Sequence, residues 1–313
     1  MRDTVGNPGG GANGGAGFGD VGPKLMLVLL CTIWGVTWPV MKIALHEIPP
    51  FSMRTVTTAL GAITLCGFCL FKHVNFYIPT AKAWLHVAVA SVLNLVGFAV
   101  FSSFAQLHTE TSRVAILAYT MPIWAAFLAW PFLGERPTGT KAVSLGLCVA
   151  GLAILIYPLT ESGFPLGIGL ALATGISWAA GTVYLKWARI NADPMAVASW
   201  QLVIAFFVIA ACMVAFEGGL RLSAAGAPAL WATAFTGVVG NGVAYGLWFS
   251  IVGRLPAMTA SLGVLGSPVI GIISSVIMLG DQPTAADLIG FALIFAASAC
   301  VLVTRQAPAE ATP

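Results

Sequence analysis

The chain has 313 residues, of which 58% are hydrophobic and only 8% are charged. A water-soluble protein carries a charged fraction of roughly 25%, so this composition excludes a soluble globule and predicts a surface that mostly contacts lipid. The formal net charge is +3, but the cations lie singly between apolar stretches, which argues against nucleic acid as a partner.

The N-terminal residues 1–23 are rich in Gly and Asn and contain no apolar core. Such a segment cannot offset the entropy lost on ordering, so we expect a disordered cytoplasmic tail. The first apolar run begins at Leu25 and is long enough to cross a bilayer, which argues against a signal peptide. A second short cytoplasmic tail is expected at residues 305–313.

Apolar stretches of membrane-spanning length recur along the rest of the chain and predict ten transmembrane helices. The predicted spans are residues 25–45, 51–71, 83–104, 112–133, 143–156, 166–186, 195–216, 229–251, 257–279 and 286–303. With a cytoplasmic N-terminus, only Lys42, Arg54, Arg113 and Arg221 of the 14 Lys and Arg residues face outward. This asymmetry favours an orientation with both termini in the cytoplasm.

The six cysteines all lie inside apolar segments, where a thiol behaves as a small hydrophobic group. Cys66 and Cys69 have the spacing of a redox or metal motif, but neither a second pair nor a histidine cluster accompanies them. We therefore expect packing residues, with no disulfide framework, metal site or cofactor.

The second half of the chain repeats the first at an offset of 144 to 146 residues. The matched pairs are Trp34 and Trp178, Lys42 and Lys186, Pro50 and Pro194, Pro122 and Pro268, and the loops at 133–138 and 279–284. Since each half holds an odd number of helices, five, the second half must be inverted in the membrane. The sequence thus predicts an all-α polytopic membrane protein of two inverted five-helix repeats, residues 24–158 and 166–304. The alternative is a duplicated scaffold that carries no cargo.

Three features of the sequence resemble the EamA branch of the drug/metabolite transporter superfamily, over about residues 25–305. They are the Trp34-Gly35-Val36-Thr37-Trp38 run, the mid-helix Pro122 and Pro268, and the Leu-Gly-acidic loops at Glu135 and Asp281. The resemblance implies bacterial inner-membrane export of amino acids or related metabolites, through a central cavity lined by helices 1, 3, 4, 6, 8 and 9. The chain departs from the family pattern at one position. The family's usual arginine of helix 2 corresponds here to Arg54, which lies only four residues past Pro50, closer than the resemblance leads us to expect.

Pro122 and Pro268 fall inside predicted spans. Each lacks a backbone N–H and frees the carbonyl four residues earlier, at Ala118 and Val264. Irregular backbone at membrane depth is tolerated where it faces protein or a watery cavity, so both prolines are candidate hinges in a cavity wall. A packing kink is the alternative.

Two predicted helices carry a polar and aromatic face at helical spacing. Asn241, Tyr245 and Trp248 form this face in helix 8, and Asn94 and Phe98 begin the corresponding face in helix 3. An amide suits the polar groups of an amino acid, and aromatic faces suit apolar groups or cations. Asparagines that face one another would favour a zwitterionic substrate, and a wide aromatic cavity would favour an amphipathic substrate. The alternative is that each Asn joins two helices by a hydrogen bond.

Four further aromatic residues complete the predicted substrate site. Trp34 and Trp38 lie one turn apart on helix 1, and Trp178 and Tyr184 lie on the matching helix 6. Lys42 ends its span, where it either reaches toward the headgroups or helps to form a vestibule that attracts anions.

Every Asp and Glu falls in a tail, a loop or a span end, so no carboxylate relay for protons is predicted inside the membrane. His86 is a titratable candidate, or else an interfacial residue. No catalytic constellation, phosphate-binding loop or channel filter is visible, which argues against an enzyme, an ATP-driven pump and a channel. We therefore predict a secondary transporter of small molecules, with a drug carrier and a non-transporting scaffold as alternatives.

Overall fold

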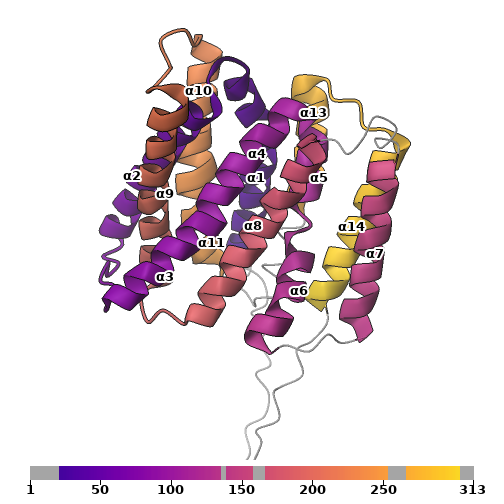
Figure 1. Ribbon diagram of the computed structural model, residues 1–313, viewed down its shortest axis with the longest axis horizontal. Coiled ribbons are helices and arrows are strands. Elements are labelled where there is room, and N and C mark those ends of the chain that lie inside the picture. Colours follow the sequence, from indigo (N-terminus) through magenta and orange to yellow (C-terminus); the bar gives the residue numbers. More distant parts are fainter. Residues whose placement is uncertain (1–20, 135–138, 158–165, 253–265, 304–313) are drawn as a thin grey trace, which may run out of the picture.

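A computed structural model describes residues 21–134, 139–157, 166–252 and 266–303, and the regular elements in these ranges are all helices. They form a bundle of roughly parallel rods (Figure 1). Residues 1–20 of the predicted N-terminal tail, the predicted tail 305–313, Glu135, Val264 and the first part of the ninth predicted span lie outside the described residues, whereas residues 21–23, predicted as the end of the first tail, begin helix α1.

The first half contains four rods and a shorter helix that follows them. Two of the rods are composite, because a π-helical segment joins α3 to α4 and a two-residue break separates α5 from α6. The elements are α1 (Val21–Glu47), α2 (Pro50–Phe71), α3 (Ala81–Ser91), η1 (Val92–Val96), α4 (Gly97–His108), α5 (Thr111–Ala118), α6 (Met121–Leu133) and α7 (Gly139–Ile156).

The second half repeats this order, including a π-helical segment inside its third rod. The elements are α8 (Leu166–Ala188), α9 (Pro194–Glu217), α10 (Ala227–Phe235), η3 (Thr236–Val243), α11 (Ala244–Val252), α13 (Gly266–Leu279) and α14 (Ala285–Val303).

Local signals explain several of the helix ends. Thr80 caps α3 by accepting a hydrogen bond from the Ala83 N–H, and Asp193 caps α9 by accepting one from Met195. At the other end of α9, Gly218 adopts φ of 74°, a left-handed conformation in which glycine carries no steric penalty. Residues at the helix ends themselves therefore determine where these helices begin or end.

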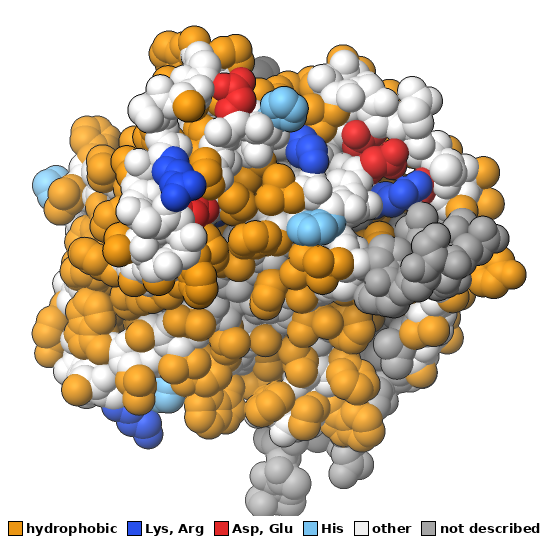
Figure 2. Space-filling model, turned by 45° about the horizontal axis from the view of Figure 1, so that its top comes forward, with side chains coloured by type: hydrophobic (Ala, Val, Ile, Leu, Met, Phe, Trp, Pro, Cys, Tyr) orange, Lys and Arg blue, Asp and Glu red, His pale blue; other side chains and the backbone are white. Residues whose placement is uncertain are grey.

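Six helical stretches among the described residues are long and apolar enough to cross a membrane, and α13 and part of α14 are shorter apolar helices. Large apolar side chains point outward along them, among them Phe71, Phe216 and Ile277, each at least 75% exposed. Figure 2 shows such side chains covering the flank of the molecule. Such a flank requires lipid, so the chain is a polytopic membrane protein. Ten spans and an inverted repeat remain predictions.

Glycines allow the closest approaches between rods. A Cβ built on Gly35 of α1 would lie 2.7 Å from Ile270 of α13, and one on Gly181 of α8 would lie 2.8 Å from the Asn94 backbone. Small residues bring membrane helices close enough for van der Waals contact between their backbones. Helix α7 instead packs chiefly on α14, at one edge of the bundle (Figure 1).

Candidate functional site

Five aromatic rings from five different segments form a connected series, which we call the aromatic row. Trp38 lies 6.0 Å from Phe98 and 6.4 Å from Tyr119, measured between ring centroids. Phe98 lies 5.2 Å from Trp178, which stacks on Tyr245 at 6.4 Å. These separations are those of favourable aromatic pairs. The row thus joins α1, α4 and the α5–α6 break to α8 and α11.

Four members of the row were candidate cavity residues, and the structure brings them together: Trp38, Phe98, Trp178 and Tyr245. Tyr119 was missed by sequence reasoning. Its signal was its place three residues before Pro122, at the helix interruption.

The other aromatic candidates lie apart from the row. Trp34 pairs with Trp248, 6.0 Å away, where α1 meets α11. The hydroxyl of Tyr184 is hydrogen-bonded to His86 Nδ1 at 2.8 Å, and its ring also contacts Trp187. His86 is thus held by a neutral partner on α8. Any role of these residues in substrate binding remains a prediction.

The two candidate asparagines lie in the two π-helical segments, at different interfaces. Asn241 donates through Nδ2 to the Thr57 carbonyl of α2, at 3.2 Å. Asn94 packs on Gly181 of α8, and its buried Oδ1 has no hydrogen-bond partner. The contact of Asn241 is an interhelical hydrogen bond, one of the two roles that its sequence position allowed.

The backbone is interrupted where Pro122 was expected to kink it. Helix α5 ends at Ala118, and α6 begins at Met121 with Pro122 as its second residue. Gly175 of α8 lies against the carbonyl of Ala118, to which Pro122 cannot donate, because a Cβ there would be 3.0 Å from that oxygen. Pro268 is buried in the first turn of α13. Pro122 thus lies at a helix start, where a missing N–H breaks no helical hydrogen bond, whereas the residues before Gly266 of α13, including Val264, lie outside the described part of the chain.

A third proline, inside α1, was not considered as a hinge. Pro39 has no N–H to offer the Gly35 carbonyl one turn earlier. Ser274 of α13 donates its hydroxyl toward that carbonyl at 3.5 Å. Helix α1 is therefore weakened beside Trp38, and α13 compensates for part of the loss.

A pocket of about 660 Å³ opens at the end of the bundle where α1 and α4 finish. It is lined by Lys42, Ile43, His46, Glu47, Leu107, Thr109, Glu110, Thr111, Leu279 and Asp281. Figure 2 shows charged and histidine side chains gathered at this end of the molecule. None of the nine predicted cavity residues lines this pocket, whereas Lys42, the predicted vestibule residue, does.

Gln106 connects this pocket to the aromatic row. Lys42 donates its ammonium group to the Gln106 carbonyl, and the Gln106 side-chain amide donates to the Trp38 carbonyl at 3.0 Å. Gln106 is fully buried, and its side-chain oxygen has no partner. Gln106 therefore links Lys42 of the pocket to Trp38 of the row by two hydrogen bonds.

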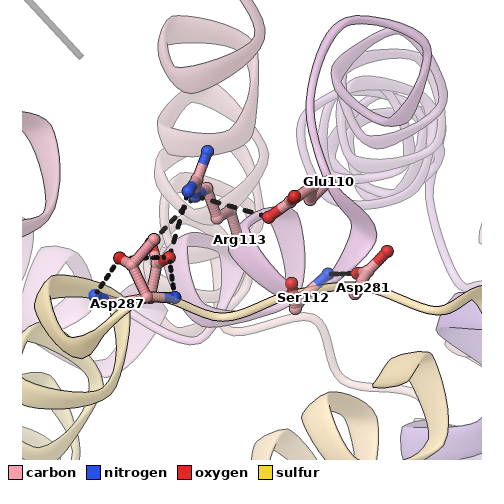
Figure 3. Close-up of polar contacts among 6 residues, drawn as sticks. Glu110, Ser112, Arg113, Asp281 and Asp287 are labelled. Carbon is pink, nitrogen blue, oxygen red and sulfur yellow. Dashed lines mark hydrogen bonds and ion pairs between the residues drawn. The ribbon is translucent and has the colours of Figure 1, made fainter. Parts of the chain in front are cut away.

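Beside the pocket, the Arg113 cluster ties α5 to α14 (Figure 3). We use this name for Glu110, Ser112, Arg113, Asp281 and Asp287. Arg113 donates two hydrogen bonds to Asp287, at 2.8 and 3.0 Å, and the Ser112 N–H donates to Asp281 at 2.8 Å. Glu110 Oε2 lies 3.7 Å from Arg113 Nε. Burial raises the pKa of Glu110, although Arg113 opposes this rise.

A model of the EamA-like transporter family matches residues 23–157 and again residues 165–303. The chain belongs to the EamA-like transporter family. One family model therefore accounts for both halves of the chain, as expected for an internal duplication. This is a family of membrane transporters, so the aromatic row and the pocket are features of a transporter.

Individual relatives agree with this assignment. The chain is 25% identical over 289 residues to the uncharacterized transporter YvbV of Bacillus subtilis, covering 90% of this chain and 92% of the relative. It is 22% identical over 291 residues to a probable amino-acid metabolite efflux pump of Escherichia coli, covering 86% and 91%. A solved crystal structure matches with a TM-score of 0.63 at 20% identity, covering 90% of this chain and 96% of that one. That likeness supports the fold alone.

Proposed function

We propose that this EamA-like transporter is a secondary transporter that exports amino acids or related small metabolites by alternating access around the aromatic row. The composition of the row carries the proposal. Trp38, Phe98 and Tyr119 come from the first matched half, and Trp178 and Tyr245 come from the second. A site shared by two repeats can be exposed to either side when one repeat moves against the other.

Repeated irregularities support the inverted architecture of two five-helix repeats. The segments η1 and η3 occupy the third rod of each half. They carry Asn94 and Asn241. A π-helical insertion is uncommon and often marks a functional position. We extend the proposal to ten spans, with both termini in the cytoplasm of a bacterial cell.

The substrate class follows from the surroundings of the row. Aromatic faces bind apolar groups and cations, and the pocket beside Lys42, Glu110 and Asp281 offers a polar entrance. The name of the Escherichia coli relative favours amino-acid metabolites. Five connected rings would also suit a larger aromatic amphipath, so a drug carrier is the second candidate.

Exchange flux in proteoliposomes tests the proposal. Purified protein is reconstituted and preloaded with one member of a panel of amino acids and amines, and uptake of the labelled compound is followed with and without a protonophore. Saturable exchange that ignores the protonophore is expected, because the acidic residues all lie toward the ends of the predicted spans. No flux for any compound would refute amino-acid export, and flux of bulky amphipaths alone would establish the drug carrier.

Two variants connect the flux to the predicted site. Trp34→Ala and Asn241→Ala should each lower the exchange rate while leaving expression in the membrane intact. Unaltered exchange in both variants would remove Trp34 and Asn241 from the transport path.

A further inference from the structure

Arg54 is a buried cation that the proposed transport path does not yet use. It lies in the second turn of α2 and is 5% exposed. Its guanidinium donates to Ser103 Oγ at 2.6 Å, to Ser102 Oγ at 2.7 Å and to the Met41 thioether at 2.6 Å. Three helices, α1, α2 and α4, thus enclose one guanidinium.

Among the residues that the structure describes, no carboxylate forms an ion pair with this guanidinium. Glu217, at the same end of α2, is occupied, because both of its oxygens accept hydrogen bonds from Phe51 and Ser52. An arginine stays protonated, and a buried charge without a counter-ion is costly. Such a group inside a transporter marks a functional position.

The two serines are oriented to accept hydrogen bonds from the arginine. Ser102 donates its own hydroxyl hydrogen to the Phe98 carbonyl at 2.6 Å, and Ser103 donates to the Ala99 carbonyl at 2.8 Å. Each oxygen therefore presents a lone pair to the guanidinium. The remaining acceptor, the sulfur of Met41, is weak, and a carboxylate would replace it with a stronger, charge-assisted bond.

Helical spacing places this guanidinium next to the aromatic row. Met41 lies one turn beyond Trp38 on α1, and Ser102 lies one turn beyond Phe98 on α4. Trp38 and Phe98 are themselves in contact, with ring centroids 6.0 Å apart. One helical turn rises about 5.4 Å, which is comparable to the distance between the ring and the carboxylate of an aromatic amino acid.

We propose that Arg54 binds the carboxylate of the transported molecule while its apolar body lies on Trp38 and Phe98. The inference rests on the proposed function and narrows its substrate class to carboxylate-bearing molecules with an apolar or aromatic side chain. A purely structural role, in which Arg54 only joins α1, α2 and α4, predicts no dependence on the carboxylate.

Three compounds that share a benzyl body separate these roles: L-phenylalanine, 3-phenylpropionate, which lacks the amine, and 2-phenylethylamine, which lacks the carboxylate. Exchange of each is measured in proteoliposomes with the membrane potential held at zero. The wild-type protein should exchange both carboxylates at least tenfold faster than the amine, because a charge-assisted contact is lost with the carboxylate. Arg54→Met should reduce both carboxylate rates to the amine level and leave the amine rate within twofold.

Two further variants complete the design. Arg54→Lys keeps the charge and should retain part of the carboxylate flux. Arg221→Met removes an exposed cation and should change none of the three rates.

Several outcomes would overturn the assignment. An equal loss for all three compounds in Arg54→Met would establish a structural role. Where Arg54→Met does not fold, the wild-type comparison decides, because equal rates for amine and carboxylates refute carboxylate recognition. Flux of the amine alone refutes carboxylate binding by Arg54 but is consistent with the proposed transport function. No flux for any compound of the wider panel refutes the proposed function as well.

Discussion

Replacing Asp287 by Asn should destabilise the protein by about 2–3 kcal/mol. The Asp287 side chain is 3% exposed and that of Arg113 is 16% exposed, so the substitution leaves a nearly buried cation without its principal partner. Breaking a fully buried pair in this way costs about 3–5 kcal/mol. The expected value is lower, because Arg113 retains some solvent and Glu110 lies 3.7 Å away.

The same carboxylate also caps α14, which adds to the expected loss. Oδ2 of Asp287 accepts hydrogen bonds from the Thr284 N–H and hydroxyl, both at 2.8 Å, while the Asp287 N–H donates back to the Thr284 hydroxyl at 3.2 Å. This reciprocal arrangement is a capping box. An asparagine keeps the shape of Asp287, but its NH2 group cannot accept a hydrogen bond. One of the hydrogen bonds from Thr284 or Arg113 is therefore lost.

A double-mutant cycle measures this interaction separately from the cap. The free energy of unfolding is determined by denaturant titration in detergent for wild type, Asp287→Asn, Arg113→Met and the double variant. A coupling energy of about 1.5 kcal/mol or more is expected for groups in direct contact. Arg221→Met, which removes an exposed cation, serves as the control.

Additive losses in the two single variants would refute this reasoning. In that case the pair would contribute nothing by its mutual contact, and the cap on Thr284 would explain the whole effect of Asp287→Asn.

Three other substitutions test the packing, the row and the pocket. Gly181→Ala should cost about 1–3 kcal/mol, since its Cβ would lie 2.8 Å from Asn94 backbone atoms, whereas Gly67→Ala, with no atom within 4 Å, should be almost neutral in the same unfolding titration. Trp178→Ala removes one ring of the aromatic row and its contacts with Phe98 and Tyr245. If an aromatic contact of about 1.4 kcal/mol with the substrate is lost as well, exchange flux should fall roughly tenfold, and full flux would exclude Trp178 from the site. Because burial raises the pKa of Glu110 above 4.5, the folded protein binds more protons than the unfolded chain above that pH, and stability falls as pH rises through this window. Glu110→Gln should make that fall shallower, and identical slopes in the two proteins would contradict the assignment.

The aromatic row shows how much of the candidate site could be predicted from residue patterns. Trp38, Phe98, Trp178 and Tyr245 were selected because helical spacing and the internal repeat assign them to helices 1, 3, 6 and 8, and these four side chains lie together in the structure. The periodicity of apolar residues decides which segments become helices. The inverted repeat that we propose would then bring corresponding helices to a common centre.

Contacts between distant segments could not be predicted in the same way. The pocket depends on Lys42 meeting the Gln106 carbonyl, 64 residues away, and the Arg113 cluster on Ser112 meeting Asp281, 169 residues away. Nothing in either segment alone specifies such a partner. Tyr119 was missed for a related reason, because its neighbours suggested a bent helix rather than a break that turns its ring toward Trp38.

Irregular backbone gathers around the row. Pro39 releases the carbonyl of Gly35, which lies three residues before Trp38. The α5–α6 break contains Tyr119, and η1 ends at Val96, two residues before Phe98. Inside a membrane such backbone is tolerated only where protein or water satisfies it, and Ser274 donates toward the Gly35 carbonyl that Pro39 leaves free. A helix with a missing bond bends at lower cost than an intact one. Among the described residues, the helices are therefore interrupted next to the aromatic row, where the alternating access that we propose would require the two halves to move.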